Sequence, residues 1–303
     1  MPKRDDAGAI RPAPRAASGS GRSRSHFIAI AAALGVIGLA GAWSAPAAAG
    51  EIVTPAEQAT EASAVRTENA QATRMPWAVG EFLEYTLKFG SITAGSGRMQ
   101  VLAHDTLRGR PVWHLQFDFS GGIPFARVND AFESWYDATD GSSLKFEQHL
   151  NELGKRRDRV YEIFPDRRTY SLNGEPEKPS VVGPLDDASF FFFIRTIPLE
   201  VGKSYEFHRY FDPRSNPVVI RVLRRDTVDV PAGRFPSIVV QPMIKTSGIF
   251  SEGGHAEIWL SADERRLLVQ MKTKLKFGSL NLYLRKYRLP ALGPGDSTVT
   301  GPP

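Results

Sequence analysis

Apolar and polar residues alternate along the middle of the chain with a period of two. In residues 112–119, Trp113 and Phe117 fall on one face with two other large apolar side chains, and mostly polar residues fall on the other. Residues 82–89 and 267–277 repeat this pattern. Alternation over five or more residues is typical of antiparallel strands with one face buried and one face in water. The pattern therefore predicts antiparallel β-structure.

Turn signals separate the alternating stretches. Asp140-Gly141 and Asn173-Gly174 are dipeptides that favour two-residue hairpin turns. Shorter stretches of the same kind lie near residues 131–137, 144–150, 158–164, 168–172, 204–211, 218–225, 237–245 and 255–260. We expect an all-β fold, mainly antiparallel: a single open, curved sheet or half-barrel of about 11 or 12 strands, with one short helix packed across it.

One segment, residues 184–197, departs from the period of two. It begins with a proline and two acidic residues, which suit a helix N-terminus, and Pro198 would end the helix. At helical spacing its apolar stripe consists of Phe190, Phe193, Ile194 and Ile197. A buried strand is the alternative, because Phe also has high β propensity. We favour a helix whose stripe packs against strand residues such as Trp113 and Phe117.

The two ends of the chain differ from this central region. Arg22 and Arg24 precede an uncharged, mostly apolar run over residues 27–43, and Ala47-Ala48-Ala49 follows. This order is typical of a secretory signal peptide, which would make the protein periplasmic or extracellular. An uncleaved membrane anchor is the alternative. We expect a signal peptide over residues 1–49, a flexible spacer over 50–74, a β domain over 75–289 and a disordered tail over 290–303.

The charge of the chain resides largely in its first residues. Of the 38 Lys and Arg residues, six lie in residues 1–49, against two of the 33 Asp and Glu residues. The remainder therefore has 32 basic and 31 acidic residues, and this balance gives no electrostatic case for nucleic-acid binding. The sequence contains no cysteine, which excludes disulfides, thiolate nucleophiles and Cys-ligated metals.

Motifs of known chemistry are weak or absent. The five histidines after residue 49 do not stand at the spacing of a metal site, so we predict neither a metal nor another cofactor. Ser142 and Lys145 have the S-x-x-K spacing of acylating hydrolases, but the segment follows a hairpin signal and is predicted to be extended rather than helical. We therefore assign no catalytic residue.

Asp186, Asp187 and Arg195 form the sharpest polar cluster in the sequence. One interpretation is a carboxylate pair at the rim of a site. The other is a helix start combined with a structural ion pair between one aspartate and an arginine from the helix or a neighbouring strand. We favour the structural interpretation, because acidic residues are common in the first turn of a helix.

Several pieces of the chain together resemble DUF3108, a family of uncharacterised exported bacterial proteins. They are VGEFLEY (79–85), ITAG (92–95), PLDDAS and the residues after it (184–195), VDVPAGRF (228–235), IWLSADERR (258–266) and FGSL (277–280). The resemblance implies a single antiparallel β domain with a short helix, and it supplies no catalytic residues. Such an architecture is similar to the open half-barrels that carry lipid or lipoprotein acyl chains in the periplasm, which is an analogy of fold.

Two classes of function follow from these expectations. The first is a non-enzymatic envelope protein whose curved sheet holds a lipid, an acyl chain or another apolar ligand. The second is a structural or interaction module of an envelope assembly, without a ligand and with an envelope protein as partner. A hydrolase with an unrecognised site ranks third. The space between helix and sheet separates the first two, since a carrier needs an apolar cavity there. The predicted lining is Trp113, Phe117, Phe190, Phe193 and Ile194.

Overall fold

The computed structural model describes residues 75–123, 126–152, 155–244, 255–275, 278–293 and 297–302. The predicted signal peptide and spacer lie outside the described residues. In the part of the chain that is described, no helix has the length and apolar character needed to cross a bilayer.

The described residues form mostly antiparallel strands in one open sheet. The α-helix among them, α2, covers Ser189–Phe193, and the 3₁₀ helices η2 and η3 cover Pro165–Arg167 and Pro213–Ser215. The strands are β1 (Phe82–Phe89), β2 (Ile92–Leu107), β3 (Arg110–Ile123), β4 (Ala126–Asp137), β5 (Ser143–Glu152), β6 (Lys155–Phe164), β7 (Thr169–Leu172), β8 (Lys178–Pro179), β9 (Ser204–Phe207), β10 (Val218–Val230), β11 (Gly233–Ile244), β12 (His255–Ser261), β13 (Leu268–Leu275), β14 (Gly278–Leu289) and β15 (Val299–Thr300).

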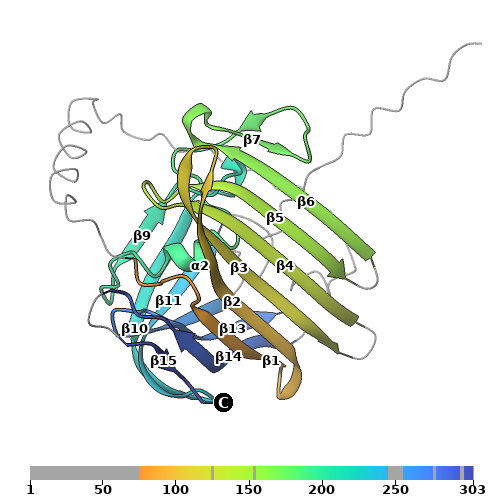
Figure 1. Cartoon of the computed structure of the whole chain (residues 1–303). Coiled ribbons are helices and arrows are strands. Elements are labelled where there is room, and N and C mark those ends of the chain that lie inside the picture. The colour runs from red at the N-terminus through yellow and green to blue at the C-terminus, as the bar shows by residue number, and fades with distance from the viewer. Residues whose placement is uncertain are drawn as a thin grey trace, which may run out of the picture.

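The first and last long strands of the chain lie side by side in the middle of the sheet, and the middle of the chain forms its two edges. Strands β1 to β8 follow one another as an antiparallel meander, and β9 to β14 form a second meander that returns to pair β14 with β1. The sheet is therefore continuous through its first and last long strands, and its open edges are the short strands β8 and β9. The segment that joins these edges carries α2, and Figure 1 shows α2 between the wall of β3–β6 and the wall of β9–β11.

Alternation along each strand separates the two faces of the sheet. On β3, Leu115, Phe117 and Phe119 are buried on the concave side, while Gln116 and the half-buried His114 belong to the convex side. This agrees with the period of two in the sequence. The antiparallel fold, the open sheet and the short helix are confirmed.

Among the described residues the sheet contains 15 strands, more than the 11 or 12 that the pattern predicts. The alternating stretches identified in the sequence do not include β2 and β14, or the two-residue strands β8 and β15. Three glycines or serines from Gly95 to Gly97 interrupt the apolar alternation of β2, whereas a two-residue strand is too short to show any period. The tail also differs from its prediction. Val299 pairs with Leu289, so the prediction of a disordered tail is wrong for residues 297–302.

The helix is much shorter than the predicted segment 184–197. After Phe193 the backbone turns with tighter hydrogen bonds, from the Thr196 N–H to the Phe193 carbonyl and from the Arg195 N–H to the Phe192 carbonyl. The side chains of Phe190, Phe191, Phe192 and Phe193 are all buried. A helix enclosed on every side has no solvent face, so a one-sided apolar stripe does not describe it.

Candidate functional site

The residues predicted to line an apolar cavity lie mainly in the core around α2. Phe117, Phe190, Phe193 and Ile194 are buried. The half-buried Trp113 lies nearer the rim of the core.

Aromatic rings fill the space between α2 and the sheet. The ring of Phe191 lies edge-on to that of Phe117 on β3, with 4.8 Å between centroids. On the opposite wall, the Phe193 ring lies 4.9 Å from that of Phe207 on β9. The predicted contact with Phe117 thus exists, but Phe191 makes it, a residue outside the predicted stripe. The helix acts as a plug in the concave side of the sheet.

A second set of rings closes the core at its N-terminal side. Trp77 packs edge-on against Phe192, with 5.3 Å between ring centroids, and against Trp113 at 6.5 Å. The Trp113 ring also contacts His104, at 4.7 Å. Trp113 therefore touches the segment before β1 and the neighbouring strand β2, and Trp77 lies between it and α2. Trp77 could not be identified from the alternating pattern, because it precedes the alternating stretches.

Asp186 is fully buried and closes the turn before α2. One oxygen, Oδ1, accepts hydrogen bonds from the backbone N–H groups of Ala188 (2.9 Å) and Ser189 (2.8 Å). Oδ2 accepts one from the Ser134 hydroxyl of β4 at 2.6 Å. Burial raises the pKa of the Asp186 carboxyl, and these hydrogen bonds counteract that rise in part. The contacts fix the start of α2 to the sheet.

Asp187 is also buried, but it faces a different set of partners. Its Oδ1 accepts a hydrogen bond from the Tyr210 hydroxyl at 2.9 Å, and its Oδ2 accepts one from Gln148 Nε2 at 3.2 Å. Burial is the main cause that raises the pKa of Asp187 to about 8, and the negative charge of Asp186 adds to it. The two carboxyls are neighbours in sequence, yet each has its own contacts with the sheet or the β9–β10 connection.

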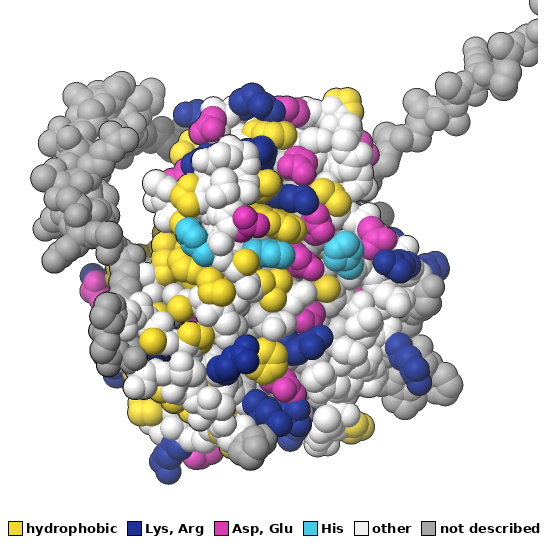
Figure 2. Space-filling view, in the orientation of Figure 1, with side chains coloured by type: hydrophobic (Ala, Val, Ile, Leu, Met, Phe, Trp, Pro, Cys, Tyr) yellow, Lys and Arg dark blue, Asp and Glu magenta, His cyan; other side chains and the backbone are white. Residues whose placement is uncertain are grey.

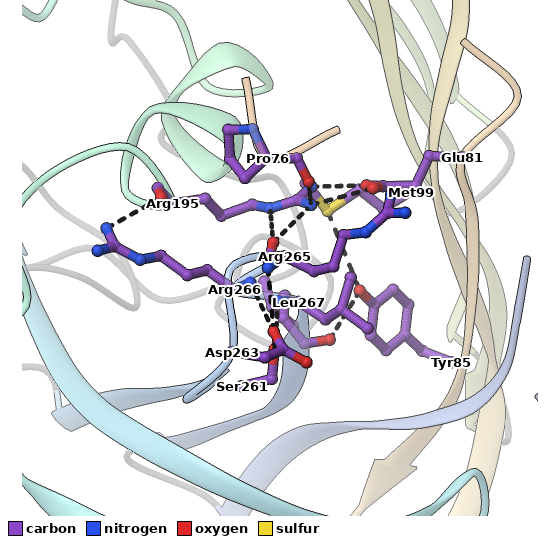
Figure 3. A network of polar contacts seen from close by, with 11 residues as sticks. Pro76, Glu81, Tyr85, Met99, Arg195, Ser261, Asp263, Arg265, Arg266 and Leu267 are labelled. Atoms are coloured by element: carbon purple, nitrogen blue, oxygen red, sulfur yellow. Dashed lines mark hydrogen bonds and ion pairs between the residues drawn. The ribbon is translucent and has the colours of Figure 1, made fainter. Parts of the chain in front are cut away.

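Arg195 pairs with Glu81 rather than with either aspartate. The guanidinium donates to both carboxylate oxygens, Nη1 to Oε1 at 2.6 Å and Nη2 to Oε2 at 3.1 Å. It also donates to the backbone carbonyls of Pro76 and Arg265. Figure 3 shows this network, in which Arg195 joins the segment before β1 to the β12–β13 turn. The sequence predicts an ion pair between one of the aspartates and an arginine. Arg195 pairs with Glu81 instead, so it is not the arginine of such a pair.

The cluster of Asp186, Asp187 and Arg195 is not the rim of an open site. All three side chains are buried, and each is held by the contacts described above. A buried charge is tolerated when it is paired and hydrogen-bonded, and the pair of Arg195 with Glu81 meets this condition. The arrangement thus supports the structural interpretation of the cluster. Its chemistry consists of fixing α2 and its flanking turns in the core.

A polar hollow lies on the opposite, convex face of the sheet. It has a volume of about 290 Å³ and is lined by residues of β2, β3, β4, β5 and β6. Across the sheet, the register places Arg98, Asp118, Ala131, His149 and Asp158 in one row. Ala131 is the smallest side chain of that row and lines the hollow between Asp118 and His149, and we call this position the floor. Figure 2 shows histidine and charged side chains on the face formed by these strands.

The strand pairing is interrupted beside this floor. Pairing of β4 with β5 stops between Val128 and Ala131, and in this gap Asp130 Oδ1 accepts a hydrogen bond from the Asn151 backbone N–H at 2.9 Å. Asp130 itself is buried. A side chain thus replaces part of the backbone ladder beside the hollow.

Ion pairs hold the walls of the hollow. Arg98 Nε donates to Asp118 Oδ1 at 3.0 Å, and burial raises the pKa of Asp118 despite this contact. On the other side, His149 Nδ1 and Asp158 Oδ1 are 2.9 Å apart, and this hydrogen bond is the main cause that raises the pKa of His149. The hollow could not be predicted from the sequence, because its residues come together only through strand register.

The described residues contain no group of three or more His, Asp or Glu side chains placed to hold a metal ion. The convex hollow is therefore described by its hydrogen-bonding groups. It presents guanidinium, carboxamide, carboxylate and imidazole groups around a small floor.

Comparison with solved structures gives distant likenesses. A β-barrel-like protein of the domain of unknown function DUF1849 from Brucella abortus has a TM-score of 0.43 and 10% identity, with 69% of this chain and 96% of that chain covered. A protein from Parabacteroides distasonis predicted to be a lipoprotein has a TM-score of 0.33 and 11% identity, with 70% and 97% covered. A protein from Bacteroides fragilis predicted to be exported, with a YmcC-like fold, has a TM-score of 0.27 and 14% identity, with 70% and 97% covered.

The comparison with curated proteins finds no match. At the level of families, the model of DUF3108, described as a protein of unknown function, matches residues 84–285. This range runs from β1 into β14 and so includes both meanders and α2. Because the match spans more than half of the chain, the protein belongs to the DUF3108 family of proteins of unknown function.

Proposed function

We propose that this protein is an exported, non-enzymatic interaction module of the cell envelope, which binds through the outer surface of a filled half-barrel. The proposal has three parts: export, a closed core and a binding role for the convex face. Each rests on a different feature of the chain.

Export is supported by the first 49 residues. The basic residues, the apolar run and Ala47-Ala48-Ala49 stand in the order of a secretory signal peptide. The absence of cysteine means that the domain needs no oxidising machinery to fold after export. A periplasmic or extracellular location follows from this part of the proposal.

The filled core is the observation that carries the proposal. Phe191 and Ile194 have no exposed surface, and Phe192 is equally buried. A lipid carrier of this architecture would need the concave space that α2 occupies. With the plug in place, the surface open to a partner is the convex face, where the polar hollow lies.

A non-enzymatic role agrees with the placement of the buried carboxyls. Asp186 and Asp187 contact protein groups that fix α2 and its neighbours. A general acid or base must reach the proton that it transfers, which a carboxyl enclosed in the core does not. Lipid carriage remains the competing proposal, and it requires that α2 leave the concave side.

Titration of the purified protein with a fluorescent fatty acid separates the two proposals. The module proposal predicts no saturable binding up to about 100 micromolar, a range that includes the micromolar dissociation constants expected of a lipid carrier. The variant Phe191→Ala is the matched control, because it opens an apolar space next to Phe117. Saturable micromolar binding by the unaltered protein would overturn the module proposal in favour of a carrier.

A further inference from the structure

We propose that the convex hollow over Ala131 binds a neutral, hydroxyl-rich ligand, namely one or two sugar units of a glycan. The inference deepens the proposed function, since it names the ligand class of the outer surface. It rests on the shape of the hollow, the hydrogen-bonding groups around it and the balance of its charges.

The shape suits a small ligand. The volume of about 290 Å³ lies near the lower end of the range for small-molecule sites, roughly 300 to 1,000 Å³. The floor is Ala131, half-buried between longer neighbours in the same row. Rigid strands carry the floor and the walls, so the hollow exists before a ligand arrives. Preformed sites lose less entropy on binding.

The lining suits hydroxyl groups. Arg98, Gln116, Asn129 and Asn151 supply planar groups that make hydrogen bonds in pairs, and Asp118 supplies carboxylate acceptors. A hydroxyl donates one hydrogen bond and accepts others. A sugar with hydroxyls on adjacent carbons therefore matches a wall that offers both donors and acceptors. The pair of Arg98 with Asp118 places a donor and an acceptor 3.0 Å apart on one wall.

The charges favour a neutral ligand. Two arginines, Arg98 and Arg156, are balanced by two aspartates, Asp118 and Asp130. His149 is flanked by two acids, with Nδ1 at 2.9 Å from Asp158 and Nε2 at 3.4 Å from Glu147. An anion would meet these carboxylates and a cation would meet the guanidiniums, so neither finds a site of one sign. A neutral polar ligand avoids both repulsions.

Nuclear magnetic resonance titration of the signal-free protein tests the inference. The probes are two neutral disaccharides, N,N′-diacetylchitobiose and maltose, which represent N-acetylated and unmodified glycans. We expect saturable amide shifts at Ala131 and Asn151, with dissociation constants of roughly 0.1 to 10 mM. The disaccharide that binds more tightly indicates which kind of glycan the hollow accepts. Glucuronic acid and inorganic phosphate serve as anionic probes.

Two variants make the test specific. Ala131→Leu fills the floor with a larger side chain at a half-buried position, and we expect binding at least 10-fold weaker. Lys274→Leu is the matched control, because Lys274 is exposed on the distant strand β13 and lies outside the hollow. Retained binding in Lys274→Leu together with weakened binding in Ala131→Leu supports the site.

Three outcomes overturn the glycan inference. The first is no shift with either disaccharide up to about 50 mM, a concentration far above the expected dissociation constants. The others are shifts with the anionic probes alone, and disaccharide shifts that Ala131→Leu leaves unchanged. None of them depends on fatty-acid binding. The proposal of an interaction module with a filled core is therefore tested separately, by the fatty-acid titration described above.

Discussion

The guanidinium of Arg195 and the carboxylate of Glu81 form a two-point ion pair inside the core, between residues 114 positions apart. The pair joins the turn after α2 to the start of β1. It thereby ties the plug to the central part of the sheet, where the first and last long strands meet. Arg195 also lies over the Trp77 ring, 5.4 Å from its centroid.

Removal of one member of this pair should destabilise the protein strongly. Arg195→Met leaves Glu81 buried without its cation, and we expect a loss of about 3–5 kcal/mol in the free energy of unfolding. Urea denaturation followed by circular dichroism measures this loss.

The double variant Glu81→Leu with Arg195→Met provides the control for that experiment. Because it removes both charges, it should lose less stability than the sum of the two single variants. Additive losses would show that the two side chains do not interact energetically.

The plug should contribute through its buried rings. Phe191→Ala removes a fully buried side chain that packs on Phe117, and we expect a loss of about 3–5 kcal/mol. The exposed apolar residue Val182 offers a matched control, since Val182→Ala should change the free energy of unfolding by less than about 0.5 kcal/mol. A loss below about 1 kcal/mol for Phe191→Ala would indicate that α2 is a mobile lid.

The sequence predicts those features of the fold that arise from local pattern. Alternation in residues 112–119 places Phe117 correctly in the core, and the same reasoning gives the antiparallel class and the open sheet. The bounds of α2 are harder to predict from the sequence. Asp186 accepts the backbone N–H groups of Ala188 and Ser189, and burial on all sides removes the one-sided stripe that normally identifies a helix.

The two polar sites depend on distant parts of the chain. The acid that pairs with Arg195 could not be chosen from sequence, because Glu81 precedes it by 114 positions. The convex hollow requires the register of five strands, and a slip of one residue would move Ala131 to the concave side. One usable signal existed: Ala131 is the smallest side chain at the outward positions near it.

Export should be accompanied by cleavage after Ala49. N-terminal sequencing of the protein recovered from the cell envelope should begin at Gly50. Replacing both Ala47 and Ala49 with glutamine should block processing, because the cleavage site requires small residues. Recovery of the intact residues 27–43 in a washed membrane fraction would instead establish the anchor.

Asp187 should make the protein less stable as the pH rises. Burial raises its pKa from 3.8 to about 8 in the folded state. Between these values the unfolded chain loses its proton and the folded protein keeps it, so stability is fully present below about pH 4 and falls as the pH approaches 8. The asparagine in Asp187→Asn cannot titrate, and its oxygen can still accept the hydrogen bond from the Tyr210 hydroxyl.

The stability of Asp187→Asn relative to the unaltered protein should therefore increase with pH. The change cannot exceed about 1.4 kcal/mol for each pH unit between the two pKa values. Urea denaturation at pH 4.5 and pH 7.5 measures it, with Asp226→Asn as control, because a hydrogen bond from the Trp259 indole N–H lowers the pKa of that carboxyl and no histidine contacts it in the described structure. The control should gain no stability between the two pH values. An equal difference at both pH values for Asp187→Asn would mean that Asp187 is ionised in the folded protein, and its contacts with Tyr210 and Gln148 would then hold a buried charge.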